Sequence, residues 1–283
     1  MPRRRQPTAR QARLGAELQK LREAAGLTGR EAAAALGTDA GRLSQIESGV
    51  AGVSEETVRR LAALYACADE ELIDALVAIA IDRTRGWWEE YRGILPPGFL
   101  DLSELEHHAR YLRVISTAHV PGLLQTEEYA RAVFSYMVPE LPDSELEPRV
   151  EHRMRRRVAV EGDDTVEYEA VIHEWVLRTK VADRHVARAQ LEQILGQSER
   201  PHVTVRVIPF EVDGFAGANS SMVYAGGPVS QLDTAKRDAP QGGPFLHAAS
   251  QLIRYRTLFR KVEAASLDPV KTRDFIHRMT KEL

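Results

Sequence analysis

The chain contains a single cysteine, Cys67, among its 283 residues. One cysteine excludes an intramolecular disulfide and fits a reducing cytoplasm, and we interpret Cys67 as a small buried residue on a helix rather than a catalytic thiol. No run of roughly 18 or more apolar residues occurs, so no membrane span is expected. The opening MPRRRQPTARQAR lacks the apolar region of a secretion signal. We therefore predict a cytoplasmic protein.

Signatures of catalysis are also missing. Neither the nucleophile motif G-x-S-x-G nor the phosphate-binding motif G-x-x-x-x-G-K-S/T occurs. His173-Glu174 resembles half of a zinc-protease motif, but Leu177 stands where the second histidine would be needed. His107 and His108 are expected on different sides of a helix and make a poor metal pair. We predict no catalytic residue, no metal and no cofactor, and hence no enzyme.

Charge is distributed unevenly along the chain. Residues 1–66 hold eleven Lys and Arg against seven Asp and Glu, a net charge of +4, which leaves −7 for residues 67–283. No acidic residue precedes Glu17. Before it come five arginines, which are Arg3, Arg4, Arg5, Arg10 and Arg13. We predict a mobile cationic arm at 1–12 that contacts DNA phosphates or a narrow minor groove, the alternative being a disordered solubilising tail.

The segment from Leu27 to Glu47, LTGREAAAALGTDAGRLSQIE, predicts two short helices joined by a tight turn. Thr28 and Glu31 form a T-x-x-E capping box at the first helix, and Gly37 suits a left-handed helix stop. Asp39 is a predicted N-cap for the second helix, in which Leu43 and Ile46 give one buried stripe. This is the pattern of a helix-turn-helix, whose second helix enters a DNA major groove. An ordinary pair of packed helices is the alternative.

The open side of the predicted recognition helix sets the possible base contacts. Ala40 and Gly41 are too short for bidentate contacts, so direct readout depends on Arg42 and Gln45, and DNA shape supplies further specificity. Thr28 and Arg30 are expected near phosphates. The predicted DNA-binding residues are Arg3, Arg4, Arg5, Arg10, Thr28, Arg30, Asp39, Ala40, Gly41, Arg42 and Gln45.

Helices are predicted on both sides of this pair. Leu14, Leu18 and Leu21 follow helical spacing up to Gly26, and Ser54 caps a helix that contains Val58, Leu61 and Tyr65. With them, LGAELQKLREAAGLTGREAAAALGTDAGRLSQIESGVAGVSEETVRRLAALY resembles the Cro/repressor-type (XRE) DNA-binding domain throughout, including the I-E-S-G that closes the recognition helix. We assign the helix-turn-helix domain to 13–68.

A connecting segment is predicted at 69–100. Residues 69–85 have apolar positions at helical spacing and predict a long bridging helix, and a Pro-Pro-Gly break follows it. Aromatic residues next to this break favour an interdomain or dimer contact over a ligand cage. The ligand or interface candidates are Trp87, Trp88, Tyr91 and Trp175.

The domain at 101–283 has a second resemblance. HVPGLLQTEEYARAV is similar to the VPGLLQT-x-x-YARA signature of WhiJ-like regulators of actinomycetes. Two later blocks match the same family, QLEQILGQSERPHVTVRVIPF and the terminal LIRYRTLFRKVEAASLDPVKTRDFIHRM. The resemblance implies a small partner protein encoded nearby, and an antitoxin-like role in some members.

The local patterns of this domain predict the α+β class. Strands are expected in VEYEAVIHEWVL, HVTVRVIPF and SSMVYAGG, and a helix from about Asp183 to Leu195. Leu102, Leu105, Ala109 and Leu112 are predicted to share one face of a helix. The Gly/Pro-rich residues 226–244 predict a flexible loop. The basic block EHRMRRR at 151–157 is interpreted as the solvated face of a helix, the alternative being a grip on nucleic acid or an acidic partner.

The fold class is therefore mainly α: a helix-turn-helix bundle, a bridging helix, and an α+β domain with a small sheet covered by helices. We expect a nucleoid-associated regulator that binds double-stranded DNA as a homodimer on an inverted repeat. Its C-terminal domain is expected to bind a small molecule or a small protein. One alternative is an antitoxin-like interaction module whose head mainly autoregulates. Another is a hydrolase or nuclease, which would require His173, Glu174 and His202 to converge on a metal.

Overall fold

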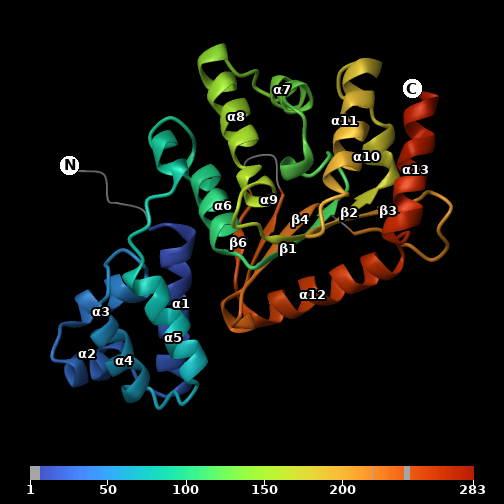
Figure 1. Cartoon of the computed structure of the whole chain (residues 1–283). Helices are drawn as coiled ribbons and strands as arrows, with labels where there is room; N and C mark the ends of the chain where they lie inside the picture. The colour runs from blue at the N-terminus through green and yellow to red at the C-terminus, as the bar shows by residue number, and fades with distance from the viewer. Residues whose placement is uncertain (1–6, 219, 239–242) are drawn as a thin grey trace. The chain divides into compact units, whose positions relative to one another are not determined.

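The computed structural model describes residues 7–218, 220–238 and 243–283. The chain divides into two compact units (Figure 1). The first contains the residues up to Trp87 together with Pro228–Leu232, and the second contains Trp88–Gly227 and Asp233–Leu283. Arg3, Arg4 and Arg5 lie outside the described residues.

The first unit is a bundle of short helices. Its members are α1 (Ala9–Ala24), α2 (Gly29–Leu36), α3 (Ala40–Glu47), α4 (Glu55–Leu64) and α5 (Glu70–Ile81). Each begins at a side-chain N-cap that accepts a hydrogen bond from a free backbone N–H, which removes an unsatisfied donor at the helix start. Leu18, Leu43, Leu61 and Leu76 are each at most 1% exposed and form the centre of one apolar core.

The helix predicted at 69–85 is α5, and it completes this bundle. Leu72, Leu76 and Val77 lie in the same core as the helix-turn-helix. The excursion Pro228–Leu232, which includes the single turn η3 (Ser230–Leu232), also belongs to the first unit, and Leu232 packs against its core. Arg13 of α1 donates a hydrogen bond to the carbonyl of Gln231.

The second unit is built on a mixed six-stranded sheet with the order β3-β2-β1-β4-β5-β6. β1 pairs in parallel with β2, and β2 with β3, whereas β4, β5 and β6 continue the sheet in antiparallel pairs. The strands are β1 (Tyr111–Ser116), β2 (Glu167–His173), β3 (Val203–Ile208), β4 (Met222–Gly226), β5 (Thr234–Arg237) and β6 (Phe245–Leu246).

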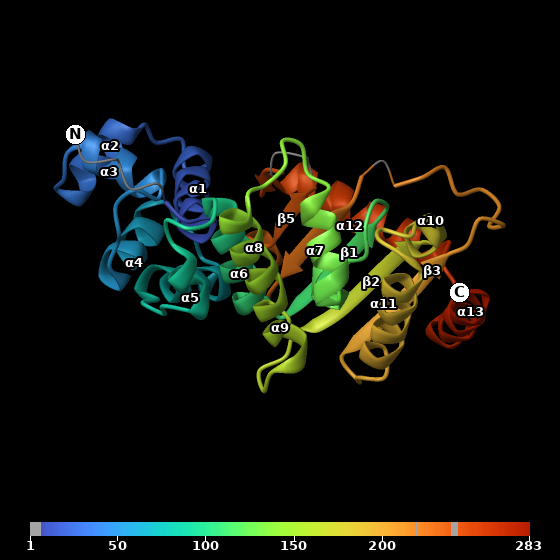
Figure 2. The same ribbon diagram turned by 90° about the horizontal axis from the view of Figure 1, so that it is seen from above.

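Helices cover both faces of this sheet (Figure 2). The α-helices are α6 (Pro97–His108), α7 (Glu127–Ser135), α8 (Asp143–Arg155), α9 (Val158–Glu161), α10 (Glu174–Arg178), α11 (Arg184–Gln197), α12 (Ala249–Ala264) and α13 (Pro269–Glu282). The short 3-10 turns are η1 (Trp87–Tyr91) and η2 (Gly122–Leu124). Among the described residues, no helix is long and apolar enough to cross a membrane.

Side-chain alternation along the strands divides the apolar residues between the two faces. Ile115 and Val171 point toward α12, where they meet Phe259, and α12 runs along this face in Figure 1. Their neighbours Val114 and Ile172 point to the opposite face and join a larger cluster with residues of α7, α11 and α13. The prediction of a small sheet covered by helices is confirmed.

Four local predictions for this domain are wrong. The strand expected in VEYEAVIHEWVL ends at His173, and Glu174–Arg178 form α10. Leu112 does not continue the helix of Leu102 and Leu105, because α6 ends at His108 and Leu112 is a buried residue of β1. Residues 226–244 are not simply a flexible loop, since β5 lies within them and pairs with β4. The carboxylate of Asp233, which is 1% exposed, accepts bonds from Tyr111, Tyr224 and Gly227 and anchors the start of that strand.

The fourth correction concerns the basic block at 151–157. His152 and Arg156 are 1% and 7% exposed, so one side of this block faces the interior, whereas Glu151 on the other side is exposed. Glu147, which precedes the block in α8, pairs with Arg131 of α7. The i,i+4 spacing of charged residues predicted the helix correctly, but it could not show which side of the helix other elements cover.

Candidate nucleic-acid interface

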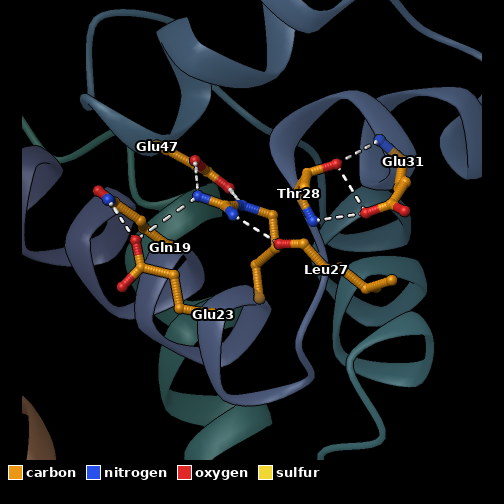
Figure 3. Close-up of polar contacts among 7 residues, drawn as sticks. Gln19, Glu23, Leu27, Thr28, Glu31 and Glu47 are labelled. Atoms are coloured by element: carbon orange, nitrogen blue, oxygen red, sulfur yellow. Dashed lines mark hydrogen bonds and ion pairs between the residues drawn. The ribbon is translucent and has the colours of Figure 1, made fainter.

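The start of α2 is fixed by a reciprocal capping box (Figure 3). The Thr28 N–H donates to Glu31 Oε2 at 2.8 Å, and the Glu31 N–H donates to Thr28 Oγ1 at 3.3 Å. The Thr28 hydroxyl also donates to Glu31 Oε2 at 2.6 Å, and this bond and the one from the Thr28 N–H lower the pKa of the Glu31 carboxyl. At the other end Gly37 has φ +71°, the left-handed conformation that a residue without Cβ adopts at little cost. The predicted helix, cap and stop are confirmed.

An ion pair joins α1 to the end of α3. Arg22 Nε donates to Glu47 Oε1 at 2.7 Å, while Arg22 Nη1 donates to the Leu27 carbonyl at 2.8 Å. Both partners of the ion pair are about 10% exposed. The hydrogen bond to Glu47 raises the pKa of the Arg22 guanidinium. One arginine therefore fixes both the start of the helix-turn-helix and its last residue; Figure 3 shows the positions of Leu27 and Glu47.

The recognition helix α3 has one buried side and one open side. Asp39 Oδ1 accepts a bond from the Arg42 N–H at 2.8 Å and caps the helix. Leu43 and Ile46 are 1% and 6% exposed and hold the helix against the core. The residues predicted on the open side of α3 are all exposed: Ala40, Gly41, Arg42 and Gln45.

The other predicted DNA-binding residues have different surroundings. Thr28 and Arg30 are exposed at the start of α2, on the surface of the same unit. Arg10 is not part of a free arm, because it lies in α1 and pairs with Asp82. Arg13 is also in α1, where it is buried and pairs with Glu17 at 3.0 Å.

Two further arginines lie beside the recognition helix and were missed from the sequence. Arg42, Arg60 and Arg83 line one hollow of about 630 Å³. Arg60 Nη2 donates to the Leu36 carbonyl at 3.3 Å, at the end of α2. Guanidinium groups are effective donors to phosphate oxygens, and this hollow places three of them next to α3. Arg60 lies in α4 and Arg83 in the loop after α5, and no local pattern relates them to α3.

The aromatic candidates do not form one site. Trp88 is 3% exposed, and its ring centroid is 5.1 Å from that of His107. Tyr91 is also buried, with its ring centroid 5.0 Å from that of His152. Trp175, on α10, is 57% exposed, and Trp87 is partly buried. A role for these residues in ligand or partner binding stays a prediction.

The residues that a hydrolase would need do not converge. Glu174 is buried, accepts a bond from the Phe210 N–H at 2.8 Å and pairs with Arg178. The His202 ring instead bonds to the Val160 carbonyl at 2.9 Å. Within the described parts of the chain, no group of three or more His, Cys, Asp or Glu is arranged to hold a metal ion.

The adjacent histidines lie at the end of α6, and the ring centroids of His107 and His108 are 4.8 Å apart.

A capped helix-turn-helix with an exposed recognition helix defines a DNA-binding regulator. Comparison with known families agrees: residues 13–76 match the family described as a helix-turn-helix domain. Residues 99–278, more than half of the chain, match a family described as a domain of unknown function, DUF5753. The chain belongs to this DUF5753 family. No curated protein and no solved structure matches the chain.

Proposed function

We propose that the protein is a sequence-specific transcription regulator that binds an inverted repeat in duplex DNA as a homodimer. The observation that carries this proposal is α3, which is held by Leu43 and Ile46 and leaves Arg42 and Gln45 exposed. An arginine can donate two hydrogen bonds to guanine, and a glutamine can bond bidentately to adenine in the major groove.

Phosphate contacts would set the position of α3 on the duplex. Arg30 at the start of α2 and Arg60 beside α3 supply positive charge, and Thr28 supplies a hydroxyl. These contacts carry affinity but little base discrimination. Arg3, Arg4 and Arg5 are proposed to add salt-sensitive contacts.

A dimer would compensate for the few base contacts of each head. Two heads about 34 Å apart reach successive major grooves on one side of the duplex, so symmetric half-sites would double the base-specific bonds. The C-terminal domain is proposed to bind a small molecule or a small protein partner and to change the affinity of the heads for DNA. The resemblance to WhiJ-like regulators supports a DNA-binding head and an effector-binding C-terminal domain. We propose that the protein acts in the cytoplasm.

Binding-site selection with the intact protein tests the proposal. The protein is incubated with random duplexes at about physiological salt, and bound DNA is sequenced over several rounds. We expect an inverted repeat whose half-site centres are about one helical turn apart. Diffuse, salt-labile binding without a motif would contradict the proposal. It would favour the alternative of an antitoxin-like interaction module whose head mainly autoregulates.

A further inference from the structure

The C-terminal unit contains a partly open cavity of about 660 Å³ that no part of the DNA-binding role uses. It lies among α6, α7, α8, the loop that precedes α7, and strands β1, β4 and β5. Apolar side chains make up much of its wall, including Phe99, Leu102, Val114, Phe134, Met222 and Phe245. A cavity of this size and lining is typical of sites for small organic ligands.

Arg153 of α8 supplies a positive charge to this cavity. Its Nη1 donates to Gln125 Oε1 at 2.5 Å, and its guanidinium carbon lies 4.7 Å from the ring centroid of Phe134. Gln125 is 1% exposed and is itself held, since its Nε2 donates to the Val120 carbonyl at 2.7 Å. Both partners of Arg153 are therefore neutral, and they fix its orientation without cancelling its charge.

A comparison with Arg156, which also lines the cavity, shows what is unusual about Arg153. Arg156 forms a bidentate pair with buried Glu106, with bonds of 2.9 and 2.5 Å. No carboxylate in the described ranges lies within ion-pair distance of Arg153, and residues 239–242 contain no acidic side chain. A charged group away from bulk water is costly unless an opposite charge balances it.

Lys236 of β5 adds a second cation to the wall. Its side chain is 12% exposed, and its ion pair is with Asp238, 3.9 Å away and 70% exposed. Burial lowers the pKa of Lys236, and the positive charges of Arg156 and Arg153 lower it further, while Asp238 and Glu106 act in the opposite direction. Burial and Arg156 lower the pKa of Arg153 to about 9, although the same two carboxylates oppose this shift. An anion bound in the cavity would offset the cost of placing the positive charges of Arg153 and Lys236 in its wall.

Gly122 leaves the space that these guanidinium groups occupy. A Cβ at Gly122 would lie 3.3 Å from Arg156 Nη1 and 3.3 Å from Arg153 Cδ. Gly122 and Gln125 both belong to the segment HVPGLLQT. That segment therefore shapes one wall of the cavity and holds its unneutralised arginine.

We propose that this cavity binds a small amphipathic organic anion. Its carboxylate or phosphate would contact Arg153 and Lys236, and its apolar or aromatic body would pack against Phe99, Phe134 and Met222. This anion would be the effector of the regulator, and to that extent the proposal rests on the proposed function. Binding can nevertheless be measured without DNA, so failure of either proposal can be recognised separately.

Competition with a fluorescent anion tests the proposal on the intact protein. Anilinonaphthalene sulfonate is bound first and then displaced by naphthoate, naphthyl phosphate or the neutral naphthalene carboxamide. We expect at least one of the two anions to displace the probe at about 10- to 100-fold lower concentration than the carboxamide does. This difference in affinity is what a charge-assisted hydrogen bond away from bulk water contributes. The better of the two anions identifies the head group.

Matched variants assign the effect to the cavity. Arg153→Met keeps an apolar stem and should reduce the preference for the anion to less than about threefold, and Lys236→Met should reduce it partly. Arg131→Met removes an arginine of α7 that pairs with Glu127 and Glu147 outside the cavity, and should keep the full preference. Circular dichroism verifies that each variant is folded. Equal displacement by acid and carboxamide in the native protein, or an unchanged preference in both cavity variants, would overturn the proposal.

Discussion

Arg22 of α1 and Glu47 at the end of α3 form an ion pair, with Nε and Oε1 2.7 Å apart. The two residues are 25 positions apart in the chain, so the bond is a tertiary one. It fixes the recognition helix relative to the first helix of the bundle. The Leu27 carbonyl accepts a second hydrogen bond from Arg22, which ties the segment before α2 to the same point.

Arg22→Met should destabilise the DNA-binding head. Methionine keeps the apolar stem but leaves the Glu47 carboxylate about 10% exposed and without this partner. Removing one partner of a pair with so little exposure is expected to cost about 3 kcal/mol. Hydrogen exchange of the intact protein, measured by mass spectrometry, should show the loss in α1 to α4. Arg59→Met removes two exposed pairs, with Glu55 and Asp74, and should have little effect. Equal effects of both variants would contradict the role assigned to Arg22.

Two glycines in helices should respond oppositely to alanine. A Cβ at Gly15 of α1 would lie 2.3 Å from the backbone oxygen of Glu47, whereas a Cβ at Gly29 meets nothing within 4 Å. Helix propensity alone predicts that both substitutions stabilise the protein. Because α1 and α3 approach each other at Gly15, we expect Gly15→Ala to destabilise the head by about 1–3 kcal/mol. Gly29→Ala should be neutral or slightly stabilising.

Thermal unfolding of the two variants measures this difference. Each variant is a control for the other, because both add the same methyl group. A stable Gly15→Ala protein would mean that α1 and α3 separate at little cost, and the close contact would then not fix the recognition helix.

The head could be predicted in detail because its signals are local. Thr28 and Glu31, three residues apart, specify a helix start, and Gly37 and Asp39 specify a stop and a new start within three positions. Each of these residues acts on backbone groups of its own segment. The Arg22–Glu47 pair could not be predicted in this way, because an arginine and a glutamate 25 residues apart have no spacing rule.

The residues of the cavity were even harder to predict from the sequence. Arg153 lies in a run of arginines in a helix rich in glutamate, a pattern typical of solvent-exposed helices. Its place in the cavity wall depends on α7, the segment around Gln125 and β5, which are brought together only by the fold. β5 itself was missed because its four residues, Thr234–Arg237, have little apolar character and are specified by pairing with β4.

Alanine substitution on α3 should separate base readout from general affinity. We expect Arg42→Ala and Gln45→Ala each to weaken binding to the selected site by about 1–3 kcal/mol and to relax base preference at the position contacted. Fluorescence anisotropy with the selected duplex and a scrambled duplex measures both effects. Arg59→Ala, which removes an exposed arginine of α4, provides the comparison. Equal losses on both duplexes would assign Arg42 and Gln45 to phosphate contacts.

Deleting residues 1–6 should weaken binding to every duplex. The deletion removes Arg3, Arg4 and Arg5 but keeps Arg10, which pairs with Asp82 in the folded head. For each phosphate that these arginines neutralise, the deletion should make the slope of log affinity against log salt shallower by about one unit. Titrations at several salt concentrations measure this slope. An unchanged slope would mean that the segment is a passive tail.

Acid should destabilise the C-terminal domain through His152. Burial, followed by the charges of Arg156, Arg153 and Arg155, lowers the pKa of His152 to about 3. Below about pH 6.5 the unfolded chain binds a proton at this histidine and the folded chain does not, so its contribution to stability falls with pH. The expected slope is about 1.4 kcal/mol per pH unit, or about 2 kcal/mol between about pH 6.5 and pH 5.

His152→Gln should remove that slope, because glutamine has no proton to gain in either state. It is compared with the native protein by urea unfolding at several pH values, using a probe in the C-terminal domain. His119 also has a pKa lowered by burial and by Arg153, so part of the acid sensitivity should persist in the variant. A second substitution, His119→Gln, should then flatten most of the remaining dependence above about pH 5, where few carboxyl groups titrate. If His152→Gln keeps the native slope, the ring is protonated in the folded protein, and the cavity beside it tolerates more positive charge than the structure implies.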